Sequence, residues 1–424
     1  ESGGSTSVAE TGSTDTFTVV LNAQPASNVV LSISSSDAGE ATVTSALTFT
    51  TANWNSAQTV TVTGADDNLV DGTQTSTLTI SIVDAVTDDN FDGVADQTVS
   101  ATTTDNDVAG FTIAESGGST SVSESGTTDT FTIVLNAQPN SDVVLSITSS
   151  DTGEATVTSA LTFTAANWNS AQTVTVTGAN DNLIDGTITS TITVAINDGS
   201  SDNNFDSVAD QTVSVTTTDD DVAGFTIAQS GGSTSVSESG TTDTFTVVLN
   251  AQPASNVVLS ISSSDSGEAT TTTSLLTFTS GNWNSAQTVT VTGIDDNIID
   301  GTINSTLTLA IVDAITDDNF DSVADQTVSV ATTDDDVAGF TIAQSGGSTS
   351  VSESGTTDTF TVVLNAQPAS NVVLNITSGD TGEATVTGTL TFTAANWNSA
   401  QTVTVTGADD NLIDGTITST LTVT

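Results

Sequence analysis

The sequence contains no lysine, arginine or histidine among its 424 residues, and it also lacks cysteine, methionine and tyrosine. Without lysine and arginine the chain cannot neutralise phosphate groups, which excludes nucleic acid as a partner. Most of the bases, nucleophiles and anion stabilisers that enzymes use are missing, so the sequence predicts a protein that is not an enzyme. No apolar run approaches the roughly 18 residues of a membrane span, so we expect no direct membrane insertion.

Acidic residues are abundant instead, since 52 aspartates and glutamates give the chain a formal net charge of -52. With no basic side chain present, no salt bridge between side chains can form. Each carboxylate must be stabilised by water, a backbone N–H group, a proton or a cation from solution. Calcium is a hard cation that takes about six to eight oxygen ligands. We therefore expect Ca²⁺ to be the cofactor and calcium ions to be the main partners.

The sequence is a tandem repeat. The segment that begins at Glu1 recurs from Glu115, Gln229 and Gln344, so the copies start 114 or 115 residues apart. That period is longer than a solenoid repeat of about 20–50 residues and fits a whole sandwich domain of roughly 100 residues. We predict four β-sandwich domains in series, at 1–109, 110–223, 224–338 and 339–424. We expect the first to lack its first strand and the fourth to stop before its last, as in a window cut from a longer precursor.

Within each repeat, apolar and polar residues alternate in short runs. Phe17, Val19 and Leu21 alternate with polar neighbours, and Leu78, Ile80 and Ile82 do the same. Such alternation is typical of half-buried strands, and threonine at the outward positions favours a pleated surface. Seven or eight short strands per repeat, separated by turn residues and without helical periodicity, predict an all-β fold of antiparallel sandwiches.

The acids are clustered in loops. Three elements recur: a lone glutamate near the repeat start, an acid loop after an alternating strand, and a closing run where one repeat passes into the next. In the first copy these are Glu10, then Asp66, Asp67 and Asp71, then Asp105 and Asp107; in the third they are Glu238, then Asp295, Asp296 and Asp300, then Asp334, Asp335 and Asp336. Like charges this close repel, and bound calcium would turn that cost into stability. A solvated acidic linker is the alternative.

The stretch Phe163–Asp185 resembles the Calx-β repeat, which has a Phe-led turn, an alternating strand and then acids. Glu124 resembles the early glutamate of that family, and the run at 219–221 is similar to its closing aspartates. The resemblance implies an immunoglobulin-like sandwich whose calcium sites gather these elements at one end. The calcium ligands that it implies in the second copy are Glu124, Asp181, Asp185, Asp219, Asp220 and Asp221. The fourth copy lacks the closing run, so we expect at most a partial site there.

A second candidate calcium loop contains Asp88, Asn90 and Asp92 followed by Gly93. This is the Asp-x-Asn-x-Asp-Gly spacing, which lets alternate side chains converge on one ion. The other copies are Asp202, Asn204 and Asp206, and Asp317, Asn319 and Asp321, each followed by serine. No helix is expected after the loop and no glutamate closes it, so it is not an EF-hand.

These features together predict a structural extracellular protein. We expect a calcium-stiffened stalk or filament of the cell surface that self-associates into fibres or bundles. The absence of lysine and arginine denies trypsin-like proteases a cleavage site, which suits an exposed location. The alternative is an adhesin module that binds glycan or a partner protein through loops such as 22–28 or through threonine-rich faces.

Overall fold

The computed structural model describes residues 4–424, so the first three residues of the opening repeat lie outside it. In this part of the chain the regular structure consists of β-strands and short 3-10 turns, with no α-helix. No helix there is long and apolar enough to cross a membrane. The chain divides into two compact units, Glu1–Asp181 with Asp185–Asp220, and Asn182–Ile184 with Asp221–Thr424. The predicted all-β fold class is confirmed.

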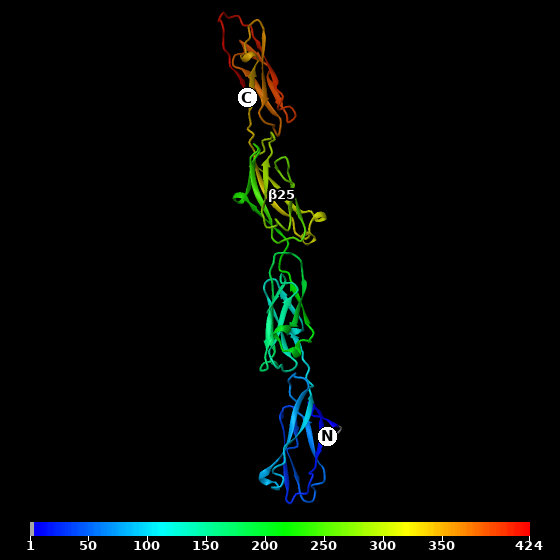
Figure 1. The fold of residues 1–424 in the computed structure, drawn as a ribbon. Helices are drawn as coiled ribbons and strands as arrows, with labels where there is room; N and C mark the ends of the chain where they lie inside the picture. The colour runs from blue at the N-terminus through cyan, green and yellow to red at the C-terminus, as the bar shows by residue number, and fades with distance from the viewer. Residues whose placement is uncertain (1–3) are drawn as a thin grey trace. The chain divides into compact units, whose positions relative to one another are not determined.

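The second repeat, in the first unit, contains every element of the pattern. It forms two sheets, with strand orders β10-β17-β16-β12-β14 and β13-β15-β11-β9, that face each other as a sandwich (Figure 1). The nine strands exceed the expected seven or eight by splitting off short edge strands. The elements are β9 (Phe111–Glu115), η3 (Ser116–Gly118), β10 (Thr120–Ser123), β11 (Thr128–Leu135), β12 (Val143–Ser149), β13 (Ala155–Val157), β14 (Ala160–Phe163), β15 (Gln172–Gly178), β16 (Ile188–Ile196), η4 (Asp198–Ser200), η5 (Asn203–Phe205) and β17 (Gln211–Thr218).

The first repeat has the same topology with one strand fewer. Its sheets have the orders β1-β8-β7-β3-β5 and β2-β6-β4. The elements are β1 (Thr6–Ala9), β2 (Thr14–Val19), β3 (Val29–Ser35), β4 (Ala41–Val43), β5 (Ala46–Phe49), β6 (Gln58–Gly64), β7 (Gln74–Ile82), η2 (Asp84–Val86) and β8 (Gln97–Thr104).

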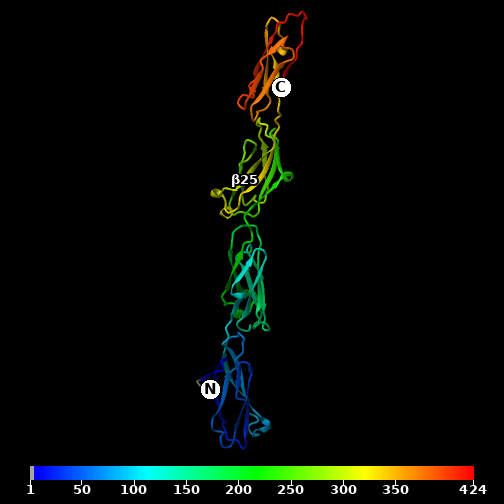
Figure 2. The same ribbon diagram turned by 180° about the vertical axis from the view of Figure 1, so that it is seen from behind.

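The second unit holds the third and fourth repeats. The third matches the second strand for strand, and β25 lies inside its five-stranded sheet in both views (Figure 1, Figure 2). Its elements are β18 (Phe225–Gln229), η6 (Ser230–Gly232), β19 (Thr234–Ser237), β20 (Thr242–Leu249), β21 (Val257–Ser263), β22 (Ala269–Thr271), β23 (Leu275–Phe278), β24 (Gln287–Gly293), β25 (Ile303–Ile311), η7 (Asp313–Ile315), η8 (Asp318–Phe320) and β26 (Gln326–Thr333). The fourth contains β27 (Phe340–Gln344), η9 (Ser345–Gly347), β28 (Thr357–Leu364), β29 (Val372–Ser378), β30 (Ala384–Val386), β31 (Thr389–Phe392), β32 (Gln401–Gly407) and β33 (Leu421–Val423).

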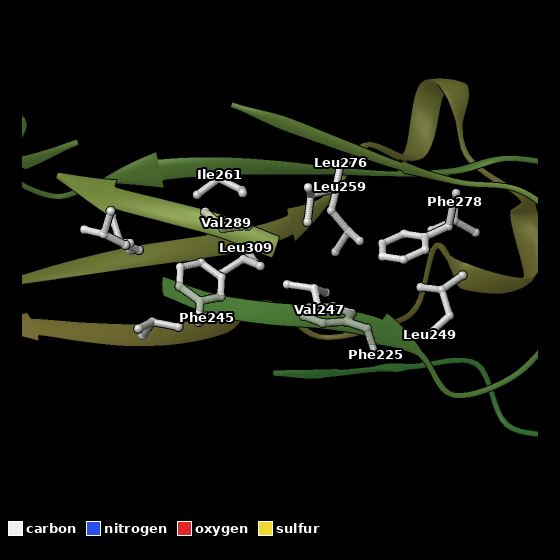
Figure 3. Close-up of a cluster of buried hydrophobic side chains, with 14 of the residues drawn as sticks. Phe225, Phe245, Val247, Leu249, Leu259, Ile261, Leu276, Phe278, Val289 and Leu309 are labelled. Atoms are coloured by element: carbon white, nitrogen blue, oxygen red, sulfur yellow. The ribbon is translucent and has the colours of Figure 1, made fainter. Parts of the chain in front are cut away.

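Each repeat has its own hydrophobic core between its two sheets. In β11 the residues Phe131, Ile133 and Leu135 are buried while the residues between them are only partly so. The alternation in the sequence therefore does select the inward face, as expected for a strand covered on one side. In the third repeat, Phe245 and Val289 of one sheet meet Leu259 and Leu309 of the other (Figure 3). Burying these side chains removes apolar surface from water, which is the main stabilising term in the sandwich.

One strand pair departs from the antiparallel pattern. Strand β10 pairs with β17 in parallel, with Thr120 opposite Val215 and Ser123 opposite Thr218. The same arrangement joins β1 to β8 and β19 to β26. A parallel pair brings the carboxyl ends of its two strands to the same end of the sheet. The residues that follow the two strands, an early glutamate and a closing aspartate run, are thereby placed together.

Candidate metal centre

Four segments of the second repeat meet at one end of its sandwich. Glu124 follows β10, the closing run follows β17, and the acid loop follows β15. The fourth segment, which carries Glu154, lies just before β13. Backbone hydrogen bonds fix these neighbours, because the N–H of Glu124 donates to Thr218 O at 3.1 Å and that of Ala179 donates to Glu154 O at 2.8 Å.

A glycine allows the closest approach in this region. A Cβ atom added to Gly178, the last residue of β15, would lie 2.0 Å from the main-chain oxygen of Ser123. Such a contact is impossible, so only glycine lets β15 pass this close to the residue that precedes Glu124. Gly64 and Gly293 make the same contact in the first and third repeats. The glutamate and the acid loop are therefore brought together by backbone packing.

The carboxylates gather into groups that share one glutamate. Within each group, one oxygen from every residue lies within 4.8 Å of the others. The early glutamate belongs to two such groups in the first and second repeats, so it stands between two possible ion positions. The groups include Glu10 with Asp105 and Asp107, Glu10 with Glu40 and Asp71, Glu124 with Asp220 and Asp221, Glu124 with Glu154 and Asp185, and Glu238 with Glu268 and Asp300.

The shared glutamate is buried without a hydrogen-bond donor. Glu124 is 1% exposed, and neither of its carboxylate oxygens has a hydrogen-bond partner. Both oxygens of the fully buried Glu238 are in the same state. A buried polar group without a partner is costly, and a buried charge more so. Since the sequence offers no cationic side chain, a proton, a water molecule or a metal ion from solution must satisfy these oxygens.

Burial and mutual repulsion make these carboxylates weak acids. Burial, together with the nearby charges of Asp219 and Asp181, raises the pKa of Glu124 to about 7. Burial likewise raises the pKa of Glu238 to about 7, with Glu268 as the strongest repelling neighbour. In the first repeat burial raises the pKa of Glu10, although a hydrogen bond from the N–H of Asn106 opposes the change. A divalent cation would reverse these shifts by favouring the ionised forms.

The first aspartate of each closing run holds the acid loop in place. One oxygen of Asp105 accepts hydrogen bonds from the N–H groups of Asp71, at 3.0 Å, and Gly72, at 2.8 Å. Asp219 and Asp334 accept the equivalent bonds from the loops at 185–186 and 300–301. These backbone donors lower the pKa of Asp334. The three aspartates were predicted as ligands, and the structure gives each of them a scaffold role as well.

The last aspartates of the closing runs have oxygens available for a ligand. One carboxylate oxygen of Asp107, and one of Asp336, is buried without a hydrogen-bond partner. Burial raises the pKa of both groups, and Asp335 and Asp295 add repulsion at Asp336. Asp107 lies in one carboxylate group with Glu10, in keeping with the predicted site.

The remaining predicted acids shape the acid loop. Asp67 accepts a hydrogen bond from Leu69 N at 2.7 Å, and Asp296 accepts one from Ile298 N at 2.6 Å. These Asx turns set the path of the loop. Asp66 accepts a 3.4 Å bond from the side-chain amide of Asn106.

One ligand position was missed by the sequence reasoning. Glu40, Glu154 and Glu268 are at most 7% exposed, belong to the groups above, and each has a buried oxygen without a hydrogen-bond partner. Burial raises the pKa of Glu40 to about 7. Each of these glutamates stands alone in a Gly-Glu-Ala turn, away from any acid run. The recurrence of Gly-Glu-Ala before a short strand in every copy is the signal that identifies the position.

The second predicted calcium loop uses its first aspartate differently. Asp202 is buried and accepts hydrogen bonds from Ser141 N at 2.9 Å and Asn204 N at 3.0 Å. Asp317 accepts bonds from Ser255 N and Asn319 N in the same way. Backbone donors from Ser27 and Asn90 lower the pKa of Asp88. Asp202 and Asp317 cap the 3-10 turns η5 and η8, and all three aspartates connect their loop to a neighbouring loop through hydrogen bonds. Calcium binding by Asp92, Asp206 or Asp321 stays a prediction.

The fourth repeat differs from the other three at its early glutamate. Its early glutamate, Glu353, is only half-buried, whereas Glu10, Glu124 and Glu238 are at most 1% exposed. No closing run follows within the sequence, which ends at Thr424.

The donor set fits calcium among the common metal ions. Every candidate ligand is a carboxylate oxygen, which suits hard cations and not metals that prefer nitrogen or sulfur. Magnesium needs near-ideal octahedral geometry and keeps several waters, whereas calcium accepts many carboxylates in irregular arrangements. The buried oxygens without hydrogen-bond partners, and the glutamate shared between two groups, form an irregular set of carboxylates of the kind that calcium accepts.

Comparisons with known proteins leave the family open. No protein-family model matches the sequence, and no curated protein matches it. Many solved structures align with it, at low similarity. One described as CBD12 from CALX1.2 has 12% identity and a TM-score of 0.22, covering 52% of this chain and 99% of its own. Domains 4–9 of the surface layer protein SbsC have 16% identity and a TM-score of 0.23, covering 84% of this chain and 50% of theirs.

An enzyme is among the aligned structures. The endo-fucoidan hydrolase MfFcnA4 of glycoside hydrolase family 107 has 12% identity and a TM-score of 0.21, and the alignment covers 78% of this chain and 43% of that chain. The present chain thus spans about half the length of this enzyme and of the surface-layer fragment. At TM-scores this low none of these similarities carries an argument about function.

Proposed function

We propose that this chain is a structural repeat segment of an extracellular or cell-surface protein, in which calcium ions stiffen a stalk or filament. The observation that supports it best is the carboxylate of Glu124, which is buried without a hydrogen-bond donor among Glu154, Asp185, Asp220 and Asp221. Carboxylates also gather around Glu238, whose two oxygens have no hydrogen-bond partner, and around Glu10, which accepts one hydrogen bond from the N–H of Asn106. A tandem array of structural sites, and not a single catalytic cleft, is the pattern expected of a spacer protein.

The carboxylates of this chain would hold the ions next to the segments that join one repeat to the next. The early glutamate lies between two groups, one built on the closing run and one on the acid loop. Calcium would supply the positive charge that these oxygens lack. The closing run at 219–221 continues through Val222 and Gly224 into β18 of the next repeat. Calcium bound to the closing run would therefore hold the segment at 219–224 in one path and reduce bending between the two repeats.

The site is also consistent with the wider proposal. A charge of -52 keeps apo chains apart by repulsion, and calcium would neutralise part of it and permit self-association into fibres or bundles. We include the three boundaries after residues 109, 223 and 338 in the proposal, because each of the four intervals has its own pair of sheets and its own core. The proposal also includes a location outside the cell, where calcium is plentiful, and a role without catalysis.

The experiment is calcium titration of the full chain, followed by thermal unfolding and small-angle scattering. We expect calcium to raise Tm and to lengthen and narrow the distribution of interatomic distances. The test variant carries Glu10→Gln, Glu124→Gln and Glu238→Gln, and it should lose most of both responses. The matched control removes three exposed charges, through Asp84→Asn, Asp198→Asn and Asp313→Asn, and should keep them.

Two results would argue against the proposal. If neither Tm nor shape responds to calcium in the parent chain, the acid clusters are solvated linkers and the array is a flexible tether. If the triple glutamine variant responds like the parent, calcium binds elsewhere. Either result would move attention to ligands of the exposed loops and threonine faces, as an adhesin would require.

A further inference from the structure

The acid loop of the first repeat makes contact beyond its own sandwich. Within the first unit, Leu69 forms an isolated parallel β-bridge with Gln138 of the second repeat. The N–H of Val70 donates to Gln138 O at 3.0 Å, and the N–H of Gln138 donates to Asn68 O at 2.7 Å. A two-way backbone bridge of this kind fixes the register of the loop against the turn at 137–139.

The apolar residue of the loop enters the core of the next repeat. Val70 is 8% exposed and belongs to the core cluster that contains Ala137 and Phe205 of the second repeat. In the second unit, Ile184 is 9% exposed and belongs to the cluster of Ala251 and Phe320. This position is apolar in all four copies, between an asparagine-led pair and an aspartate.

The second candidate calcium loop, at 202–206 and 317–321, also contacts the same apolar residue. The side-chain amide of Asn204 donates to Val70 O at 2.6 Å, and that of Asn319 donates to Ile184 O at 3.0 Å. Asn90 is the equivalent residue of the first repeat, which has no acid loop before it among the described residues. Its side-chain amide donates to Asp88 of its own loop instead. Phe91 is only half-buried, whereas Phe205 and Phe320 are fully buried.

The exposed fraction of the equivalent apolar residue differs among the four acid loops. Ile299 has the turn of the fourth repeat beside it, since the N–H of Gln367 donates to Asn297 O at 2.7 Å. The sequence of the fourth repeat ends before its Asn-Phe loop, and Ile299 is 42% exposed. Ile413, with neither wall among the described residues, is 106% exposed. Val70 and Ile184, which contact both the turn and the Asn-Phe loop of the next repeat, are at most 9% exposed.

We propose that the turn Ala137–Pro139 and the loop Asp202–Asp206 form a docking cradle whose partner is the acid loop of the preceding repeat. Asn204 and Asn319 are its positioning residues. Their side-chain amides donate to the main-chain carbonyl of the apolar residue of the preceding acid loop. The partner is defined by chemistry as an asparagine, two apolar residues and an aspartate presented as a short extended segment. The inference goes beyond the proposed function, since none of these contacts involves an ion.

An asparagine suits this position for two reasons. Its N–H and side-chain carboxamide are used separately, the N–H by the Asx turn of Asp202 and the side-chain amide by the preceding repeat. An amide donor also carries no charge, so it can approach the acid-rich loop without adding repulsion. An aspartate here would remove the donor and place another carboxylate against the acid loop.

The test is hydrogen exchange of the full chain, measured by mass spectrometry in chelator, with Asn204→Ser compared to Asn90→Ser. The two asparagines occupy the same place in their loops, but only Asn204 contacts a preceding acid loop among the described residues. Loss of one neutral hydrogen bond predicts exchange that is about fivefold faster at the amides of Val70 and Gln138 in Asn204→Ser. Asn90→Ser should leave these amides unchanged. A second variant, Val70→Ala, should open the same amides and should leave the far end of the second repeat protected.

Equal exchange in Asn204→Ser and Asn90→Ser would overturn the cradle, whether both variants accelerate it or neither does. Protection of Val70 and Gln138 that is already absent in the parent chain would overturn it too. Because the exchange is measured in chelator, a failure of calcium binding would not change the rates at these amides. Calcium-dependent Tm is recorded on the same samples, so a failure of the proposed function is seen separately.

Discussion

The main-chain oxygen of Ser123 lies 2.0 Å from the point where a Cβ atom on Gly178 would be placed. The end of β15 therefore passes directly against the residue that precedes Glu124. This contact, and not the acids themselves, sets the distance between the early glutamate and the acid loop. Mutations at this glycine should affect the candidate metal centre without touching a carboxylate.

We expect Gly178→Ala to destabilise the second repeat by about 1–3 kcal/mol, because the methyl group must displace the backbone at Ser123. Urea denaturation of the full chain, followed by hydrogen exchange of fragments from the second repeat, measures the effect. Gly199→Ala is the matched control, since a Cβ atom there meets nothing closer than Asn197 Oδ1 at 4.0 Å. Similar losses in the two variants would show that the close approach is not what matters.

The glutamate in the Gly-Glu-Ala turn should be a calcium ligand in its own right. We expect Glu154→Gln to weaken calcium binding in the second repeat by at least about tenfold, as removal of a coordinating or supporting carboxylate does. Calcium titration monitored by exchange of fragments near Glu124 measures it. Glu115→Gln is the control, because the third and fourth repeats carry glutamine at that position. Equal calcium affinity in the two variants would remove Glu154 from the site.

The sequence identified most of this centre because acids in runs are conspicuous. Glu10, Asp71 and Asp107 were found from the acid loop and the closing run, and the structure brings them into shared groups. Glu40 was not found, because a single glutamate in a turn looks like an ordinary exposed residue. Its burial comes from packing of its turn against the end of β6, which a sequence pattern does not report.

The fold was predictable to the level of strands and layers. Alternation such as that of Phe131, Ile133 and Leu135 identifies the buried face, and the repeat length identifies the sandwich. Strand direction is not encoded in alternation, so the parallel pairing of β10 with β17 was missed. The spacing of Asp202, Asn204 and Asp206 was open to two interpretations, because an Asx-capped turn and a calcium loop place polar residues at the same intervals.

In the absence of calcium, the stability of the chain should fall as pH rises. The pKa of Glu124 is raised from an ordinary value of 4.5 to about 7 in the folded state, so the folded chain binds more protons than the unfolded chain between these values. Stability then decreases with pH across this window and levels off above it. Urea midpoints in chelator from pH 4.5 to pH 8 measure this. Rising or constant midpoints would contradict the buried, unpartnered state of Glu124 and Glu238.

The docking cradle and the metal centre share the acid loop, so they should be coupled. Val70 is held by the second repeat, and its neighbour Asp71 belongs to a carboxylate group of the first. Asn204→Ser should therefore weaken calcium binding in the first repeat, by a few-fold, although Asn204 is not among its ligand groups. Calcium titration followed at fragments containing Glu10 measures it, with substitution of the exposed neighbour, Asn203→Ser, as control. Unchanged affinity in Asn204→Ser would mean that the two contacts act independently.

Unfolding of the parent chain at pH 8, with saturating calcium and with chelator, tests the central claim most directly. Because burial raises the pKa of Glu124 and Glu238 to about 7, both are largely ionised in the folded state at pH 8, so the repulsion that calcium would relieve is then near its largest. We predict that calcium at 100 times its Kd stabilises the folded chain by about 2.7 kcal/mol for each independent site, seen as a higher urea midpoint and Tm. Identical midpoints in calcium and in chelator would contradict it.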